Sequence, residues 1–144
     1  GANLITVHAE LGPRVKDLLW QIRSCGVHVG LAVNPPTSIE SALPHLDAID
    51  LLLIMTVNPG FGGQSFIPEV LTKVEMAARR RKAQQLKFRI EVDGGINPET
   101  GSQSFQAGAD TLVAGSSLFR RTHLKSAVSQ LRSTCMRQSL NLPL

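Results

Sequence analysis

The sequence predicts an α/β fold with parallel strands, either a doubly wound open sheet or an incomplete TIM (β/α)8 barrel. Five short apolar segments alternate with segments of helical periodicity along the 144 residues. The apolar segments are near-continuous runs of Val, Ile and Leu, which is typical of parallel strands covered on both faces. A closed barrel needs ~250 residues, so five strand–helix units would leave it incomplete. Composition and periodicity do not separate the two architectures.

The five expected strands are residues 4–9, 27–33, 49–57, 88–92 and 111–114. Apolar residues at helical spacing mark the first and the last of the intervening helices. They are Val15, Leu18, Leu19 and Ile22 in the first, and Leu124, Ala127, Val128 and Leu131 in the last. Gly26 and Gly108 follow helical segments and are expected to end them, Gly108 in the left-handed conformation.

Three helix starts carry recognisable caps. Thr37 and Glu40 have the spacing of a capping box, in which each side chain accepts from an unpaired amide of the first turn. Asn97 precedes a proline and an acid, which predicts an N-cap followed by a proline at the first helical position. Pro68 marks a similar start after the third strand.

The charge balance is basic, with 15 Lys and Arg against 11 Asp and Glu and a net charge of +4. The positive charge falls in residues 79–89 and 120–137, which we interpret as solvated helix faces. Aromatic residues make up only 4% and Tyr is absent, so the sequence offers no stacking platform for bases. We therefore expect no nucleic-acid partner. An anionic small molecule suits the same charge.

The sequence also bears on the surroundings of the protein. No apolar run reaches the ~18 residues that span a bilayer, so we expect no membrane partner. Cys25 and Cys135 lack metal-ligand spacing and favour a reducing compartment. Gly1 stands where a helix–strand connection is expected, so residues 1–144 are interpreted as the C-terminal part of a single domain. We expect a cytoplasmic location, and an organellar one stays open.

Glycine-rich turns follow the last three expected strands. They lie at residues 57–64, 93–95 and 114–117, and together they are called the glycine cup below. Active sites of both architectures lie beyond the carboxyl ends of the strands. Glycines expose backbone N–H groups to an anion, and Ser116 opens a helix whose positive end favours the same charge. Three such turns at neighbouring strands predict a phosphate site.

Asp93 is the acid at a strand end inside this cup. Strand alternation places Glu91 and Asp93 on one face and Val92 on the other. In a barrel that face is the interior, with Asp93 at the mouth and Glu91 one layer deeper. Because Asn97 already supplies the helix cap, a capping role for Asp93 is disfavoured.

These motifs resemble the ribulose-phosphate 3-epimerase family. The resemblance is carried by IMTVNPGFGGQSFIP at residues 54–68, EVDGGIN at 91–97, AGAD at 107–110 and VAGS at 113–116. Residues 6–10 (TVHAE) and 30–35 (GLAVNP) fit the fourth and fifth strands of the family. The resemblance extends over residues 1 to about 119 and, beyond Arg120, is limited to the presence of a last helix.

The resemblance implies a TIM barrel that interconverts D-ribulose 5-phosphate and D-xylulose 5-phosphate by proton transfer at C3. Such chemistry uses two carboxylates, one on each side of a planar enediolate, and one divalent metal ion: Zn, Fe, Mn, Co or Mg. Asp93 would be one acid/base group and also a metal ligand, and Met55 an apolar wall beside the substrate. The phosphate would be held by Gly60, Phe61, Gly62, Gly63, Gly94, Gly95, Gly115 and Ser116.

The sequence departs from the family in lacking the earlier strands. Two histidines and the second acid/base aspartate of the family lie on strands that this sequence does not contain. Among the residues present, His8 is expected to line the mouth or to be hydrogen-bonded in the core, whereas His28, Asp50 and Asp110 fall at the opposite strand ends. The chain alone is therefore expected to be inactive.

Two alternatives stay open at this stage. One is a non-catalytic half barrel that binds a sugar phosphate, and the other is an allulose-6-phosphate 3-epimerase. Gly62 and Gly95 favour the pentose phosphate enzyme over the second alternative. The resemblance further implies a small-molecule sugar phosphate partner and a homo-oligomeric full-length protein.

Overall fold

The computed structural model describes residues 1–139, and the side chains of residues 1–135. One parallel sheet contains five strands in the order β1-β2-β3-β4-β5. They are β1 Leu4–His8, β2 His28–Val33, β3 Leu51–Met55, β4 Arg89–Asp93 and β5 Thr111–Val113. Each expected strand is confirmed to within two residues at either end.

The strand order decides between the two predicted architectures. A doubly wound sheet reverses its strand order at a switch point, whereas here every strand pairs with the next one in the sequence. Sequential parallel pairing is the arrangement of a (β/α)8 barrel. The chain is therefore an incomplete TIM barrel.

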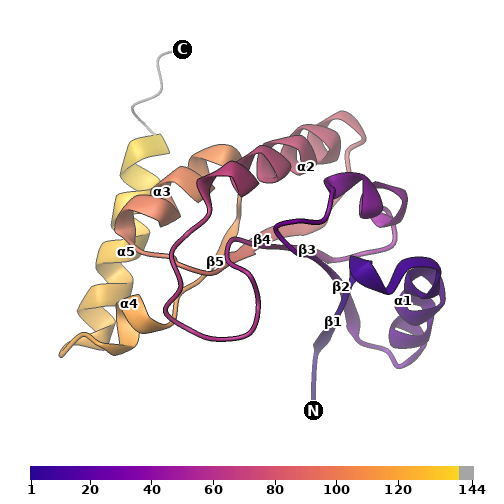
Figure 1. The fold of residues 1–144 in the computed structure, drawn as a ribbon, viewed down its shortest axis with the longest axis horizontal. Coiled ribbons are helices and arrows are strands. Elements are labelled where there is room, and N and C mark those ends of the chain that lie inside the picture. Colours follow the sequence, from indigo (N-terminus) through magenta and orange to yellow (C-terminus); the bar gives the residue numbers. More distant parts are fainter. Residues whose placement is uncertain (140–144) are drawn as a thin grey trace.

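The helices form an arc around one face of the sheet (Figure 1). They are α1 Val15–Ser24, α2 Leu71–Ala83, α3 Pro98–Ala107, the single-turn α4 Ser116–Phe119 and α5 Leu124–Ser139. Helix α1 contacts β1 and β2, and α3 packs between α2 and α5. No helix in residues 1–139 is long and apolar enough to cross a membrane. Cys25 and Cys135 form no disulfide.

The core lies between the sheet and this arc of helices. The strand residues that face the helices are almost completely buried; they include Val29, Leu31, Leu52, Ile54, Ile90 and Val92. The opposite face, which becomes the interior of a closed barrel, is only partly covered: Glu91 is half-buried and Val113 is 38% exposed. The alternation predicted for β4 is thus confirmed. Of the predicted helix faces, Val15, Leu19 and Ile22 are buried in the first; in the last, Leu131 is buried and Leu124 is 42% exposed.

The predicted caps have mixed outcomes. Asn97 is the N-cap of α3, and its side chain accepts from the amides of Glu99 at 2.8 Å and Thr100 at 3.0 Å. Gly108 ends α3 with φ +112°. Helix α2 is preceded by a 3-10 turn at Pro68–Val70, which agrees with the start marked by Pro68.

The capping box at Thr37 was wrong. Ser38 is the cap, and it begins only a 3-10 turn, Ile39–Ser41, followed by a second one at Leu43–His45. The Thr37 hydroxyl instead hydrogen-bonds the Glu10 carboxylate. Pro44 lies at the start of the second turn, where its missing N–H cannot continue a helix from the residues before it. The second unit of the barrel therefore lacks an α-helix.

Two aspartates link helices to the amino-terminal ends of the strands in the same way. Asp50 precedes β3 and accepts from Arg23 at 2.7 Å and from the Val29 amide at 2.8 Å. Asp110 precedes β5 and accepts from Arg81 and from the Ile90 amide, the latter at 2.8 Å. Each carboxylate joins the last turn of a helix to a neighbouring strand. Both lie at the strand ends remote from the glycine cup, as the sequence predicted.

Candidate active site

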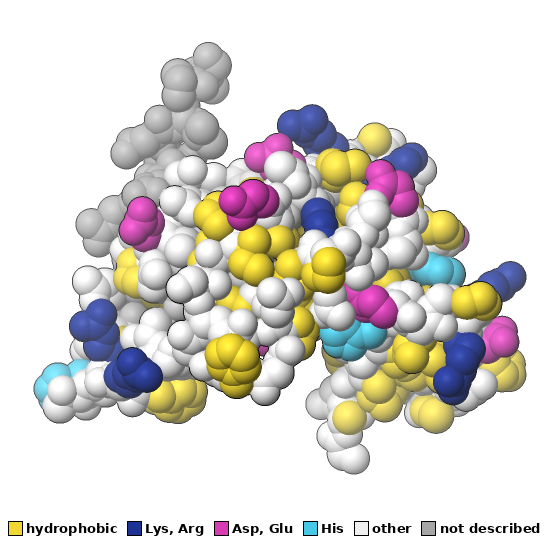
Figure 2. All heavy atoms as spheres, in the orientation of Figure 1, with side chains coloured by type: hydrophobic (Ala, Val, Ile, Leu, Met, Phe, Trp, Pro, Cys, Tyr) yellow, Lys and Arg dark blue, Asp and Glu magenta, His cyan; other side chains and the backbone are white. Residues whose placement is uncertain are grey.

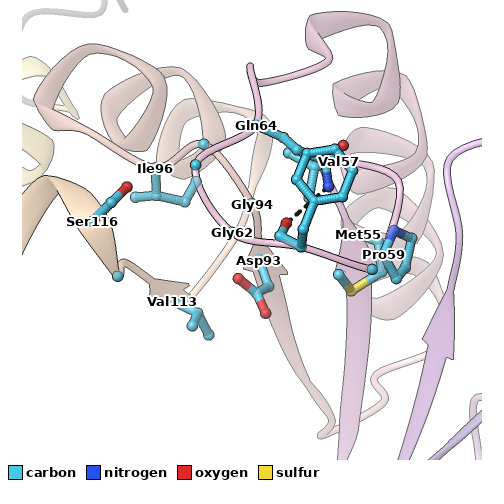
Figure 3. Close-up of a pocket in the computed structure, with 15 residues that line it drawn as sticks. Met55, Val57, Pro59, Gly62, Gln64, Asp93, Gly94, Ile96, Val113 and Ser116 are labelled. Atoms are coloured by element: carbon cyan, nitrogen blue, oxygen red, sulfur yellow. Dashed lines mark hydrogen bonds between the residues drawn. The ribbon is translucent and has the colours of Figure 1, made fainter.

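A cavity of about 310 Å³ opens at the carboxyl ends of β3, β4 and β5 (Figure 3). This volume lies within the ~300–1,000 Å³ range of small-molecule pockets. Its lining comprises Met55, Val57, Pro59, Gly60, Phe61, Gly62, Gly63, Gln64, Asp93, Gly94, Gly95, Ile96, Val113, Gly115 and Ser116. All ten residues predicted for the site are in this set. The structure thus brings the three turns of the glycine cup together around one space.

The first turn of the cup, after β3, is held in shape by Gln64. Its side-chain amide donates to the backbone carbonyls of Asn58 and Phe61, the second at 2.9 Å (Figure 3). A Cβ atom built on Gly60, Gly62 or Gly63 would meet no atom within 4 Å. The glycines of this turn therefore border open space, and Phe61 is 75% exposed.

The second turn, after β4, requires glycine for a different reason. Gly94 and Gly95 have φ values of +124° and +65°. A Cβ on Gly94 would lie 2.4 Å from the Val57 side chain, and one on Gly95 would lie 2.6 Å from the Phe66 amide nitrogen. The fully buried Thr56 donates from its hydroxyl to the Gly94 carbonyl at 2.7 Å. These contacts seat the second turn directly against the first.

The third turn, after β5, leads into α4. Gly115 is the N-cap of this helix, and a Cβ there would also meet open space. Ser117 donates from its hydroxyl to the Ile96 carbonyl, which links this turn to the second one. Because α4 has only four residues, its dipole is small, and the helix would attract an anion less than the sequence suggested. The backbone amides of the three turns and the Ser116 hydroxyl are the remaining candidate donors to an anion.

Asp93 is the last residue of β4, and its carboxylate points into the cavity. It lies between Val113 on one side and Met55 and Pro59 on the other (Figure 3). Partial burial raises the pKa of Asp93 above its ordinary value of 3.8. Glu91 lies one row deeper on the same face, and its pKa is raised by burial and by the charge of Asp93. A carboxyl group with a raised pKa can both take and give a proton nearer to neutral pH.

The metal implied by the resemblance does not fit the donor set of this chain. Asp93 is the only carboxylate in the cavity lining, and residues 1–139 contain no group of three potential His, Cys, Asp or Glu ligands. His8 contacts Glu10, as expected of a mouth or hydrogen-bonded residue. His28 lies at the amino-terminal end of β2, 3.3 Å from Asp50. One carboxylate does not make a metal centre.

Five lining residues were not singled out in advance: Val57, Pro59, Gln64, Ile96 and Val113. The first three belong to the glycine-rich motif of the first turn, and this could have indicated that they line the site. Val113 could have been found by alternation from Thr111 along β5. Ile96 had no such signal, because it lines the cavity only through the turn that Gly94 and Gly95 create.

The fold is an incomplete α/β barrel with a cavity at the carboxyl ends of its strands. The structure is similar to a 3-hexulose-6-phosphate synthase (TM-score 0.67, 18% identity, 93% of this chain and 62% of that one). It is also similar to KGPDC from Streptococcus mutans (TM-score 0.68, 18% identity, 95% and 62%). At such identities the likeness concerns the fold alone.

Sequence comparison gives the family. The model of the ribulose-phosphate 3 epimerase family matches residues 1–119. The chain is 42% identical over 135 residues to the ribulose-phosphate 3-epimerase of Bacillus subtilis, covering 93% of this chain and 62% of the relative. The corresponding Mycobacterium tuberculosis enzyme is 42% identical over 144 residues, covering 100% and 63%. The chain belongs to the ribulose-phosphate 3-epimerase family, and it spans about 60% of the length of these relatives.

Proposed function

We propose that the chain is the phosphate-binding and proton-transferring part of a ribulose-phosphate 3-epimerase. The observation that carries the proposal is the placement of Asp93 in one cavity with all three turns of the glycine cup. The turns supply backbone N–H groups for the phosphate. Asp93 supplies an acid/base group beside the sugar.

The reaction divides between these two parts of the cavity. The glycine cup anchors the phosphate and so fixes the position of the sugar chain. Asp93 takes the proton from C3 on one side, and the C–H electron pair moves to form the enediolate with the oxygen at C2. Return of a proton to the opposite side of C3 inverts that carbon. Met55 closes one side of the cavity with an apolar wall that limits access of water.

The second proton-transfer group has no counterpart in the cavity, because Asp93 is its only carboxylate. The chain likewise offers only one ligand, Asp93, to the divalent metal that the family resemblance implies. No step of the reaction is assigned to that metal. We therefore expect no epimerisation by this chain alone. The same observation favours the second candidate function, a non-catalytic half barrel that binds a sugar phosphate.

Nucleic acid is not part of the proposal. On the face shown in Figure 2, Lys and Arg side chains are scattered, with one neighbouring pair at the lower left, and do not gather into one large basic patch. Electrostatic binding to nucleic acid depends on such a patch. Three features stay predictions: residues 1–144 as the C-terminal part of one barrel domain, a homo-oligomeric full-length protein, and a cytoplasmic location.

Calorimetric titration with ribulose 5-phosphate tests the binding half of the proposal. Gly62→Asp adds a negative charge beside the open space of the cup and is expected to abolish binding. Gln21→Glu adds the same charge on the exposed face of α1 and should leave binding unchanged. Equal binding of ribulose 5-phosphate by both variants would refute phosphate binding in the glycine cup. Binding of nonspecific DNA with a steep salt dependence would favour a nucleic-acid function instead.

Complementation tests the catalytic half. A fragment of the Bacillus subtilis relative that carries its first three strand–helix units is added to this chain, and exchange of the C3 hydrogen of ribulose 5-phosphate is followed in D2O. We expect restored exchange that Asp93→Asn removes and that Asp47→Asn, at an exposed position, retains. Exchange that survives Asp93→Asn refutes the role of Asp93. Binding without any restored exchange supports the non-catalytic alternative.

A further inference from the structure

A second group of polar side chains lies at the carboxyl ends of β1 and β2, outside the cavity. His8 Nδ1 is 3.2 Å from Glu10 Oε2, and Glu10 Oε1 accepts from the Asn34 amide at 2.9 Å. The ammonium of Lys73 donates to the carbonyls of Asn34 at 3.0 Å and Pro35 at 2.7 Å, and also to that of Thr37. The Glu10 carboxylate is therefore held between His8 at the end of β1 and the loop after β2, and Lys73 of α2 fastens that loop.

These contacts determine how the His8 ring is held. Partial burial acts to raise the pKa of Glu10, but hydrogen bonds from the Thr37 hydroxyl and the Asn34 amide outweigh it, and the net pKa is lowered. Glu10 is thus a carboxylate at neutral pH, and a carboxylate only accepts hydrogen bonds. The proton of a neutral His8 must then lie on Nδ1, which leaves the lone pair of Nε2 as a free acceptor.

The position of His8 in the sheet places its ring on the same face as Asp93. His8 pairs with Ala32, Ala32 with Leu53, and Leu53 with Glu91. His8 therefore lies on the face that carries Asp93 and at the same end of the strands. Its side chain is 43% exposed. In an eight-stranded barrel, strands four apart face each other across the interior, so β1 lies across the mouth from β5 and one position away from facing β4.

We propose that His8 is a further substrate-binding residue and that Glu10 is its positioning residue. The Nε2 atom of His8 accepts a hydrogen bond from a hydroxyl group of the sugar at the end remote from the phosphate. The ligand class is a polyhydroxylated sugar phosphate, since phosphate in the glycine cup directs the rest of the chain across the mouth. This inference rests on the proposed function, because it requires the phosphate to occupy the cup.

Nitrogen-detected NMR of the histidine rings tests the inference on the unaltered chain. The expected His8 spectrum is that of the tautomer protonated on Nδ1. Ribulose 5-phosphate is expected to shift the His8 Nε2 resonance, whereas inorganic phosphate, which fills only the cup, is expected to leave it in place. Glu10→Gln should change the tautomer ratio and reduce the response to the sugar, which a merely structural contact would not do.

Two substitutions of His8 separate its two nitrogens in a calorimetric titration. His8→Asn keeps a donor near the position of Nδ1 and loses Nε2; we expect it to weaken ribulose 5-phosphate binding by about 5- to 10-fold, the effect of one lost hydrogen bond. His8→Gln places an amide oxygen or nitrogen near the position of Nε2 and should retain more of the affinity. Binding of inorganic phosphate should be unchanged in both variants.

The outcomes distinguish this inference from the proposed function. Binding of both probes with an unmoved His8 Nε2 resonance overturns the role of His8 and leaves the cup intact. Equal losses of phosphate and sugar binding in His8→Asn show a structural role and also overturn it. If neither probe binds the unaltered chain, both the inference and the proposed function are wrong.

Discussion

At the scale of single residues, the site depends on backbone shape more than on side chains. The turn after β4 reverses direction through two glycines with positive φ values, +124° at Gly94 and +65° at Gly95. Neither position has room for a Cβ atom, because Val57 and Phe66 lie against them. Asp93 directly precedes this turn, so the proposed acid/base group and the proposed phosphate site share one support.

The turn can be tested by replacing Gly95. Gly95→Ala places a Cβ atom 2.6 Å from a backbone nitrogen at a left-handed φ, which we expect to cost about 1–3 kcal/mol of unfolding free energy. Urea unfolding measures the change. Gly62→Ala is the matched control, since its Cβ meets open space at an ordinary φ, and its effect should stay within about 0.5 kcal/mol. Equal stability of the two variants contradicts the packing described here.

Whether a site residue could be predicted depends on whether a local motif or the packing of the turns places it in the cavity. The glycines and Asp93 could be predicted from the sequence because each stands at a strand end within a glycine-rich motif, whereas Met55 was indicated only by the family resemblance. Ile96 could not, since its place in the lining depends on how the second turn packs on the first. The link between His8 and Glu10 was also hidden, because only the structure shows that Glu10 turns back to the ring.

At the scale of elements, the strands were predictable and the segment after β2 was not. Buried parallel strands are near-continuous apolar runs, so their positions can be predicted from the local sequence. The segment at residues 37–45 has the sequence pattern of a helix start but forms two 3-10 turns. Tertiary contacts decide this, since Thr37 binds Glu10 and Lys73 binds three carbonyls of the preceding loop. Neither contact is visible in local sequence.

The aspartate links at the amino-terminal edge give a pH prediction. Burial acts to raise the pKa of Asp50, but the Val29 amide and the Arg23 guanidinium outweigh it, so the net pKa lies below its ordinary value of 3.8. A lowered pKa contributes stability above the ordinary value, and that contribution is lost as the pH falls through the folded-state pKa. The wild type should therefore lose unfolding free energy from about pH 4 downward.

Substitution of Asp50 isolates this contribution. Asp50→Asn is expected to lower the unfolding free energy by about 1–2 kcal/mol at pH 7, because it weakens charge-assisted hydrogen bonds. It should also flatten the decline of stability below about pH 4. Chemical denaturation at a series of pH values checks both effects, with Asp47→Asn as an exposed control. A pH profile that is the same in both variants would count against the link.

At the scale of the whole molecule, the incomplete barrel leaves two sheet edges unpaired. Edge strands present unpaired N–H and C=O groups to other chains. On β1, Leu4 and Ile5 are 37% and 40% exposed, and Val113 on β5 is 38% exposed. We expect the isolated chain to associate with itself or aggregate through these edges.

Sedimentation velocity over a range of concentrations tests this association. Ile5→Lys places a charge on the β1 edge and should shift the distribution towards the monomer. Met76→Lys alters a side chain that is 42% exposed on α2, a helix that contacts the inner strand β4, and should leave the distribution unchanged. A monodisperse wild-type monomer with a sharp cooperative melt would contradict the incomplete-barrel account.

The most direct test of the central claim is an amide NMR titration of the chain with ribulose 5-phosphate. If the three turns grip the phosphoryl group, the largest shift changes fall on the amides of Gly62, Gly94, Gly95, Gly115 and Ser116, with smaller ones at Asp93. The basic end of α2 should remain unaffected. Changes centred on that helix, or none at the three turns, would show that the phosphate binds elsewhere or not at all.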